Sequence, residues 1–397
     1  MTNRGNCKAA AVLFLALGAV GLMNPAIAQT GSESAHPLEL EVVYKGDAWA
    51  NVSGGQHRDA TYLDNLDLVA SFDGERGLGL HGTRFVVSAL YNNRNTFSDR
   101  IVGDTHTISN IDTDGALRLY EAWVDYEFGR GALKAGLIDL NSEFDKNETG
   151  GLFVNSSHGI GPDFSQIGAT GPSIFPVTGL GTRLRIDVTP RLQFRLGVFE
   201  GVPGSAEHPR RTVIRLNPRE GQLLVGEAEY RLGESGRFVL GVRQLSGRAG
   251  DPQDPDNLPR QAQTGGYALI EGPVAMLGGG KLDAFARIGL ADPYSHDIAG
   301  YLGFGTVFSG PVFAGEAQQE QVGLAVGIIS NSTRFRREQE ATGNPLDRHE
   351  TAIELTYRIQ ATPWLALQPD VQYIINPGSN PALGNALAVG LRFELGW

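Results

Sequence analysis

Few residues in this chain stand at spacings that could support chemistry. The nearest approach is the stretch Asn110-Ile111-Asp112-Thr113-Asp114-Gly115 with Glu121 in the twelfth place, which nearly spells a calcium-binding loop. An EF-hand needs a helix on each side of that loop, whereas residues 117–128 alternate like a strand. The first position is also Asn in place of Asp. The pattern therefore favours an Asx/Gly turn over a calcium site.

The other chemical motifs are weaker still. No helical pattern follows the glycine runs at 179–181 and 278–280, so neither predicts a dinucleotide fingerprint. No G-x-S-x-G elbow is present. The 8 histidines are scattered without metal-ligand spacing. We therefore expect no cofactor, no metal site and no enzymatic activity.

The first residues have the features of a secretory signal. An apolar run covers residues 9–23, basic residues precede it, and Ala26-Ile27-Ala28 follows it as a small-residue cleavage site. We expect residues 1–28 to be a signal peptide and residues 29–397 to form one domain. The single cysteine, Cys7, would leave with the signal, so the mature protein would contain no disulfide.

Charge and hydropathy narrow the class of protein. The whole chain carries a net charge of −11, and loss of Arg4 and Lys8 with the signal takes it to −13. This acidity argues against nucleic acid as a partner, because phosphate contact needs a basic surface. No apolar run after the signal is long enough to cross a bilayer as a helix.

The dominant pattern is alternation with a period of two. In the last stretch, Val389, Leu391, Phe393, Leu395 and the terminal Trp397 alternate with glycine and charged residues. In a soluble sandwich the apolar side would face a core, and in an outer-membrane barrel it would face lipid. A chain that ends on an aromatic residue of such a strand resembles proteins of the outer membrane.

The spacing of these alternating stretches favours the barrel. We expect about sixteen strands, near 38–45, 63–72, 80–91, 117–128, 132–140, 179–188, 191–199, 222–231, 237–245, 265–271, 281–290, 298–307, 321–329, 351–360, 364–374 and 386–397. Connections after odd-numbered strands are mostly long, including 46–62 and 92–116, and those after even-numbered strands are mostly short. Outer-membrane barrels have this rhythm. The connections at 272–280 and 308–320 are longer than it allows.

The longest connection is the Gly/Pro/Ser-rich stretch 141–178. A structureless loop of this length is unusual in a compact domain unless it has a function. A barrel of about sixteen strands is too wide to be filled by its own side chains. The fold class we expect is all-β, a transmembrane antiparallel up-and-down β-barrel, with residues 141–178 folded inward after strand 5 as a constriction loop.

Several longer motifs carry a resemblance to a known family. The chain resembles the carbohydrate-selective outer-membrane porins, the OprB-like or glucose-porin family, over most of its mature length. The segments that carry the resemblance are 118–123, 136–139, 152–160, 162–164, 174–178, 198–204 and 368–378. It implies a porin that passes glucose-type mono- and small oligosaccharides by passive diffusion into the periplasm of a Gram-negative bacterium. It also implies an integral, multi-pass protein in contact with outer-membrane lipid.

Alternation assigns candidate channel residues to the polar side of each strand. On the fourth strand we favour Tyr120, Ala122, Val124, Tyr126 and Phe128 outward. Side chains that face the lumen, or that lie in the inward loop, could exchange hydrogen bonds with a sugar, and Trp123 could cover a pyranose ring. The candidates are Glu121, Trp123, Asp125, Asn155, Ser156, His158, Asp163, Arg183, Arg185, Arg195, Gln368, Asp370 and Arg392.

Each candidate has a structural alternative. The charged residues could pair with one another and serve only to keep the lumen hydrated. For His158, a hydrogen bond to the backbone of its own loop is favoured over one to a sugar hydroxyl. The inward arginines also leave open a general or anion-preferring diffusion porin. Both a homotrimer and a monomer fit the sequence.

Overall fold

The structure is a computed structural model that describes residues 36–205, 208, 210–214, 220–246, 262–313 and 319–397. The predicted signal peptide (1–28) and the expected mature start at Gln29 lie outside these residues. The structural statements below concern the described residues.

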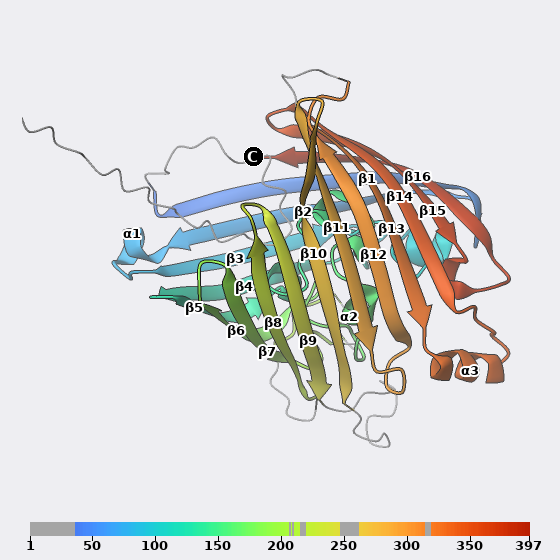
Figure 1. The fold of residues 1–397 in the computed structure, drawn as a ribbon, viewed down its shortest axis with the longest axis horizontal. Helices are drawn as coiled ribbons and strands as arrows, with labels where there is room; N and C mark the ends of the chain where they lie inside the picture. The colour runs from blue at the N-terminus through green and yellow to red at the C-terminus, as the bar shows by residue number, and fades with distance from the viewer. Residues whose placement is uncertain (1–35, 206–207, 209, 215–219, 247–261, 314–318) are drawn as a thin grey trace, which may run out of the picture.

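Sixteen antiparallel strands form one closed barrel in which each strand pairs with its neighbours in sequence and β1 pairs with β16 (Figure 1). The first eight strands are β1 (Leu38–Gly55), β2 (Ala60–Asp73), β3 (Thr83–Asn92), β4 (Leu117–Phe128), β5 (Gly131–Ile138), β6 (Gly179–Asp187), β7 (Leu192–Glu200) and β8 (Gln222–Leu232). The others are β9 (Gly236–Ser246), β10 (Gln263–Leu277), β11 (Gly280–Ala291), β12 (Ile298–Ser309), β13 (Glu320–Asn331), β14 (His349–Thr362), β15 (Leu365–Ile375) and β16 (Gly384–Gly396). The predicted number of strands and their topology are confirmed.

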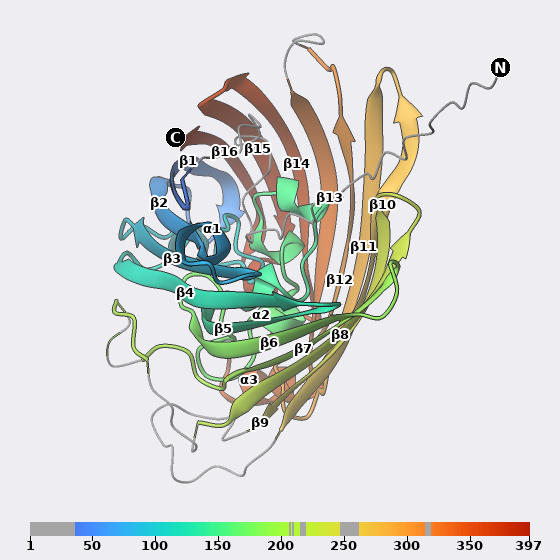
Figure 2. The same cartoon turned by 90° about the vertical axis from the view of Figure 1, so that its left-hand side faces the viewer.

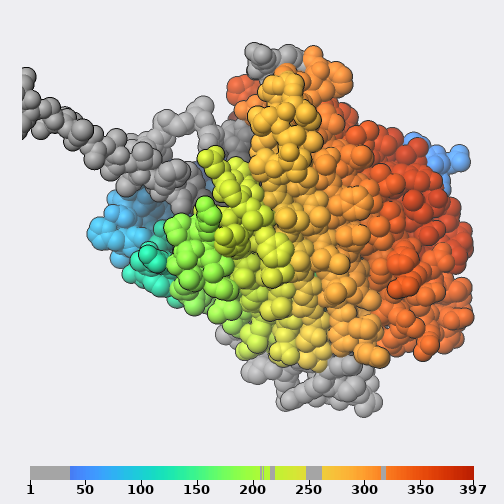
Figure 3. Space-filling view, in the orientation of Figure 1, coloured from blue at the N-terminus to red at the C-terminus, as the bar shows by residue number. Residues whose placement is uncertain are grey.

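The two faces of the wall follow the alternation of the sequence. Val389 and Leu391 on β16 are exposed on the outside. The next residue, Arg392, is 8% exposed and faces inward. On β4, Tyr126 is exposed and Glu121 and Trp123 are buried inside, as predicted. The outer side chains form a continuous surface over β8 to β14 (Figure 3). An apolar outer face of this kind is stable only against hydrocarbon.

Two predicted connections are wrong. The stretch 46–62 is mostly strand, because β1 runs to Gly55 and β2 begins at Ala60. The stretch 272–280 is also mostly strand, because β10 runs to Leu277 and only Gly278 and Gly279 form the turn. Both of these glycines have positive φ (55° and 82°), which glycine adopts without strain.

The helices are short. They are α1 (Gly74–Leu78), α2 (Pro162–Ser165) and α3 (Thr333–Ala341), and Ser332 caps α3 by accepting a hydrogen bond from the Phe335 N–H at 3.2 Å. Among the described residues, no helix has the length and apolar character needed to cross a membrane.

The apolar core of the molecule lies inside the barrel, between the wall and segments that fold inward. Phe144 of the β5–β6 connection contacts Phe199 of β7, with ring centroids 6.0 Å apart. Phe153 of the same connection contacts Phe285 of β11, also at 6.0 Å. Figure 2 shows this connection in green within the ring of strands. A buried apolar cluster therefore joins the inward-folding segments to the wall.

Candidate channel constriction

The segment that fills much of the lumen is residues 139–178, which join β5 to β6 and are called the inward segment here. Beside α2 it contains three short 3₁₀ turns, Leu140–Ser142, Gly150–Leu152 and Ser156–His158. Short polar side chains start two of these turns. Asp139 accepts from the Asn141 N–H at 2.9 Å, and Asn155 accepts from the Ser157 N–H at 3.0 Å. The segment thus takes part of its shape from its own sequence.

Three glutamates of the wall accept hydrogen bonds from backbone N–H groups of the inward segment. The pairs and their O···N distances are Glu227 with Asp145 at 2.9 Å, Glu271 with Thr149 at 2.6 Å, and Glu354 with Val154 at 2.6 Å. A buried N–H without an acceptor costs about 1–3 kcal/mol, and a segment without strand pairing has many such groups. The wall carboxylates therefore replace the secondary structure that this segment lacks.

Arg287 of β11 joins two distant parts of the inward segment. Its guanidinium donates to the Asp145 carboxylate at 2.8 and 2.6 Å and to the Asp163 carboxylate at 2.7 and 3.3 Å. All three side chains are buried. Burial raises the pKa of Asp145 to about 6, and the adjacent Arg287 opposes that rise, so this carboxyl is ionised at neutral pH. The three residues form a paired cluster that holds both ends of the segment on one wall.

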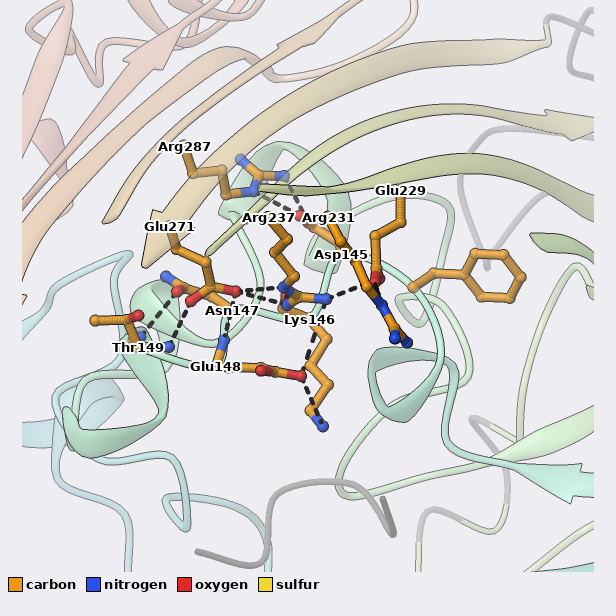
Figure 4. A network of polar contacts seen from close by, with 12 residues as sticks. Asp145, Lys146, Asn147, Glu148, Thr149, Glu229, Arg231, Arg237, Glu271 and Arg287 are labelled. Carbon is orange, nitrogen blue, oxygen red and sulfur yellow. Dashed lines mark hydrogen bonds and ion pairs between the residues drawn. The ribbon is translucent and has the colours of Figure 1, made fainter. Parts of the chain in front are cut away.

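A second arginine, Arg237 of β9, holds the part of the segment between them (Figure 4). It donates to Glu271 at 2.7 Å and to Glu229 at 3.1 Å, and it also contacts the Lys146 carbonyl. Glu148 lies 4.0 Å from the same guanidinium. Arg237 thus links two wall carboxylates to the backbone of the segment.

Glu143 holds the beginning of the inward segment to β5 and β6. Its carboxylate pairs with Lys134 of β5 and with Arg183 of β6, the latter at 2.8 Å. Although burial opposes ionisation, these two cations lower the pKa of Glu143 to about 2. Lys134 also lies 4.0 Å from the centre of the Trp123 ring, so a cation already covers one face of this indole.

Arg195 of β7 completes the row of inward arginines. It pairs with Glu227 at 2.6 Å and with Glu229 at 3.0 Å. Unlike Arg287, it keeps 17% of its side chain exposed. We call Arg183, Arg195 and Arg237, together with their carboxylate partners, the ion-pair belt.

A second connection, residues 93–116 between β3 and β4, also lies against the inner wall. Ser109 donates to Asp47 of β1 at 2.7 Å, and Arg392 of β16 donates to the Asn110 side chain at 2.8 Å. Gln372 of β15 donates to the Ile108 carbonyl at 2.8 Å. The sequence indicated a long connection here but not its inward course. The apolar pattern of Val102, Ile108 and Ile111, all buried, is the one signal that could have indicated it.

The structure divides the thirteen sequence-predicted site residues into two groups. The first group is buried where the wall meets an inward segment or its own ion pairs, and it comprises Glu121, Trp123, Asn155, His158, Asp163, Arg183, Gln368, Asp370 and Arg392. The second group keeps part of its surface exposed, and it comprises Asp125, Ser156, Arg185 and Arg195. Most of the predicted residues therefore lie buried between the wall and the inward segments and do not line the open channel.

Two expectations about the inward segment need correction. His158 is 1% exposed, its ring packs against Phe153 and Phe285, and its Nε2 lies 3.7 Å from Glu354 Oε2, so it faces neither the lumen nor a hydrogen-bond acceptor in its own backbone. Burial lowers the pKa of His158 to about 3. Asp163 is 0% exposed and is occupied by Arg287, so it does not line the channel either. The sequence did not indicate the wall residues that bind the inward segment, which are Arg237, Arg287, Glu271 and Glu354.

The stretch that resembled a calcium loop forms no such loop. Asp112 accepts from the backbone N–H groups of Phe97 and Ser98 at 2.9 and 2.7 Å, and Asn110 accepts from Arg392. Within the described residues, no group of three or more His, Cys, Asp or Glu side chains is arranged to hold a metal. The turn lies against the inner wall.

These features define a class of protein. A closed antiparallel barrel of sixteen strands, with an apolar outer face and a charged interior narrowed by inward segments, is an integral outer-membrane porin. Residues 57–396 match the model of the carbohydrate-selective porin, OprB family, and the chain belongs to that family.

Individual relatives agree with this assignment. Porin B of Pseudomonas aeruginosa is 24% identical to this chain over 91% of the chain and 87% of its own length. The high-pH structure of Pseudomonas putida OprB is 21% identical and has a TM-score of 0.78, with 91% of this chain and 94% of that one covered. The outer-membrane channel DcaP of Acinetobacter baumannii has a TM-score of 0.57 at 11% identity, with 92% and 99% covered. These structural likenesses show the shared barrel fold.

Proposed function

We propose that the protein is a passive channel through which glucose-type mono- and small oligosaccharides diffuse across the outer membrane into the periplasm. The inward segment sets the size limit, and partly exposed members of the ion-pair belt give the sugar a weak binding site. A weak site is needed, because a tightly held sugar could not leave toward the periplasm. The proposal involves no covalent chemistry.

The observation that carries the proposal is the pairing of charges inside the barrel. Arg195, Arg183 and Arg185 all lie within 3.3 Å of a carboxylate oxygen. Paired groups present many hydrogen-bond donors and acceptors with little net charge, which suits a neutral polyol. A phosphate or a carboxylate would have to compete with the carboxylates already bound. The pairing therefore argues against the anion-preferring alternative.

Liposome swelling with glucose and with gluconate, which is similar in size but negatively charged, tests this proposal. We expect the wild-type protein to pass glucose faster. Faster entry of gluconate would contradict sugar preference and would support the anion-preferring porin.

Arg195→Gln tests the binding site within the same assay. We expect a several-fold lower rate for glucose, because the substitution removes a partly exposed donor and leaves Glu227 and Glu229 with less compensation. Arg334→Gln is the matched control, since Arg334 of α3 pairs with Asp297 and Glu338 on the surface. Equal glucose rates in the two variants would remove Arg195 from the site.

We further propose that residues 1–28 are a signal peptide and that residues 29–397 form the single barrel domain. The basic and apolar start and the Ala26-Ile27-Ala28 site support this division. Each barrel encloses its own channel, so the transport proposal holds equally for a monomer and for a homotrimer.

A further inference from the structure

Two acidic side chains meet at the end of the barrel that carries the long connections. Asp104 belongs to the inward connection 93–116, and Glu350 stands near the start of β14. Asp104 is 8% exposed and Glu350 is 0% exposed. Neighbouring Gly103 and Thr105 are only half-buried, so the pair lies just beneath the surface.

The carboxylate oxygens of this pair are poorly satisfied. Glu350 Oε1 accepts from the backbone N–H groups of Thr105 at 2.8 Å and His106 at 3.2 Å. Its other oxygen, Oε2, and both carboxylate oxygens of Asp104 are buried without a hydrogen-bond partner of ordinary geometry. The other polar groups that act on the pair are neutral, namely the Ser98 hydroxyl and the Thr107 N–H on Asp104 and the Thr105 side chain on Glu350. Three buried carboxylate oxygens are thus available at one place.

The charged side chains that act on the pair are themselves negative. The charge that acts on Glu350 is that of Asp104, and the charge that acts on Asp104 is that of Asp112. Burial raises the pKa of Asp104 to about 7. Buried carboxylates are normally paired with a cation or bound to a metal, because an isolated buried charge is costly. This pair therefore calls for a positive charge that the neighbouring side chains do not supply.

A second carboxyl pair in the same barrel shows the alternative solution. Glu354 of β14 and Asp370 of β15 lie beside each other on paired strands. Glu354 is satisfied by the N–H groups of Val154 and Asn155. Of the four carboxylate oxygens of Asp104 and Glu350, Glu350 Oε1 alone accepts a hydrogen bond of ordinary geometry. Backbone N–H groups of the inward segment therefore satisfy Glu354, whereas three oxygens of the Asp104–Glu350 pair are left for another ligand.

We propose that Asp104 and Glu350 bind a hard divalent cation, with Ca²⁺ as the expected ion. Two carboxylates neutralise its charge, and the Ser98 hydroxyl, backbone carbonyls and water complete a shell of oxygen ligands, as Ca²⁺ requires. The site is distinct from the Asn110–Gly115 turn. Because its two carboxylates come from the 93–116 connection and from β14, the ion fastens that connection to the wall.

The test uses the full mature chain refolded into detergent, free of lipopolysaccharide and treated with EDTA. Calorimetric titration with CaCl₂ measures binding, and the apparent midpoint of thermal unfolding measures its effect on stability. We expect one saturable site with a dissociation constant of about 10⁻⁴–10⁻³ M, the range of weak extracellular calcium sites. The midpoint should rise as CaCl₂ is added.

Substitutions at the pair and beside it separate this site from other calcium binding. Asp104→Asn and Glu350→Gln should each weaken binding at least about tenfold and abolish the shift of the midpoint. In EDTA, Asp104→Asn should be as stable as the wild type or more so, because it removes a buried charge. Asp99→Asn changes an exposed acid of the same connection, and Glu354→Gln changes a buried carboxyl group elsewhere on β14. Both controls should bind Ca²⁺ as the wild type does.

Two results would overturn the proposal. One is the absence of saturable Ca²⁺ binding by the folded wild-type protein, which needs no variant to fold. The other is unchanged binding in a folded Asp104→Asn or Glu350→Gln protein, which would place the ion elsewhere.

Discussion

The Arg287 cluster offers the sharpest test of how the channel is narrowed. Arg287→Met keeps the length of the side chain but removes the four hydrogen bonds to Asp145 and Asp163. Two buried carboxylates are then left facing each other without their cation. Removing one partner of a buried ion pair costs about 3–5 kcal/mol. The loss destabilises the attached inward segment, because the strand pairing of the wall does not depend on it.

The size of this effect can be converted into an opening equilibrium. Each 1.4 kcal/mol changes a ratio about tenfold, so the open fraction of the segment should rise by roughly 10²–10⁴. A detached segment widens the lumen. We therefore expect higher single-channel conductance in planar bilayers, and faster entry of larger oligosaccharides relative to glucose than in the wild type in liposome swelling.

Two controls make this result interpretable. The triple variant Arg287→Met, Asp145→Asn and Asp163→Asn removes all the charges and should regain much of the narrow channel, because it leaves no uncompensated carboxylate. Arg334→Met removes a surface arginine with two ion pairs and should leave conductance unchanged. Retarded gel mobility after heating would establish that each barrel is folded. A folded Arg287→Met protein with wild-type conductance and size limit would refute the reasoning.

Two further predictions concern the stability of the inward segment. Glu354→Ala should lower the free energy of unfolding by about 2–4 kcal/mol, because it leaves the buried N–H groups of Val154 and Asn155 without an acceptor, and Glu354→Gln should lose about half as much. Denaturant unfolding followed by tryptophan fluorescence measures both, and midpoints equal to the wild type would contradict the role of this side chain. His158 has a pKa of about 3 when folded and about 6.5 when unfolded, so the unfolded chain binds the extra proton between these values and stability falls as the pH falls through that range. In His158→Phe, the decrease in the free energy of unfolding between neutral pH and pH 4 should be about 3 kcal/mol smaller than in the wild type. The same decrease in both proteins would exclude His158 as its source.

Much of the barrel could be predicted from local sequence. The alternation around Arg392, and from Glu121 to Tyr126 on β4, assigned side chains to the correct face, because the side-chain period of a regular strand is two. The period breaks at Tyr120, which was expected outward: a register irregularity lies between Leu119 and Glu121, Leu119 is exposed, and the Tyr120 hydroxyl donates to Asp139 of the inward segment. The stretch 46–55 escaped prediction for a physical reason. Gly46 and Asp47 look like turn residues, yet β1 continues through them because it is hydrogen-bonded on both sides there and its inward Asp47 pairs with Arg392. Beyond Ala50, β1 pairs with β16 alone, and Gly54 has a positive φ of 65° at a register irregularity.

The candidate site was predicted less completely. The sequence placed a long connection at 141–178 and selected its polar residues as contacts for a substrate. Asn155 and Asp163 instead bind the wall, through Gln372 and Arg287. A polar residue in an inward loop can face either water or a buried partner, and its own sequence neighbourhood does not distinguish the two.

The sequence by itself therefore determined that this chain forms strands, which side of each strand is apolar, and that the closed wall needs a long connection to narrow it. Those properties depend on neighbours a few residues apart. The tertiary structure alone decided which wall residues hold that connection. Arg287 and Asp145 are 142 residues apart, and Glu354 and Val154 are 200 apart, so their pairing arises only when the barrel closes and brings β11 and β14 to the same lumen.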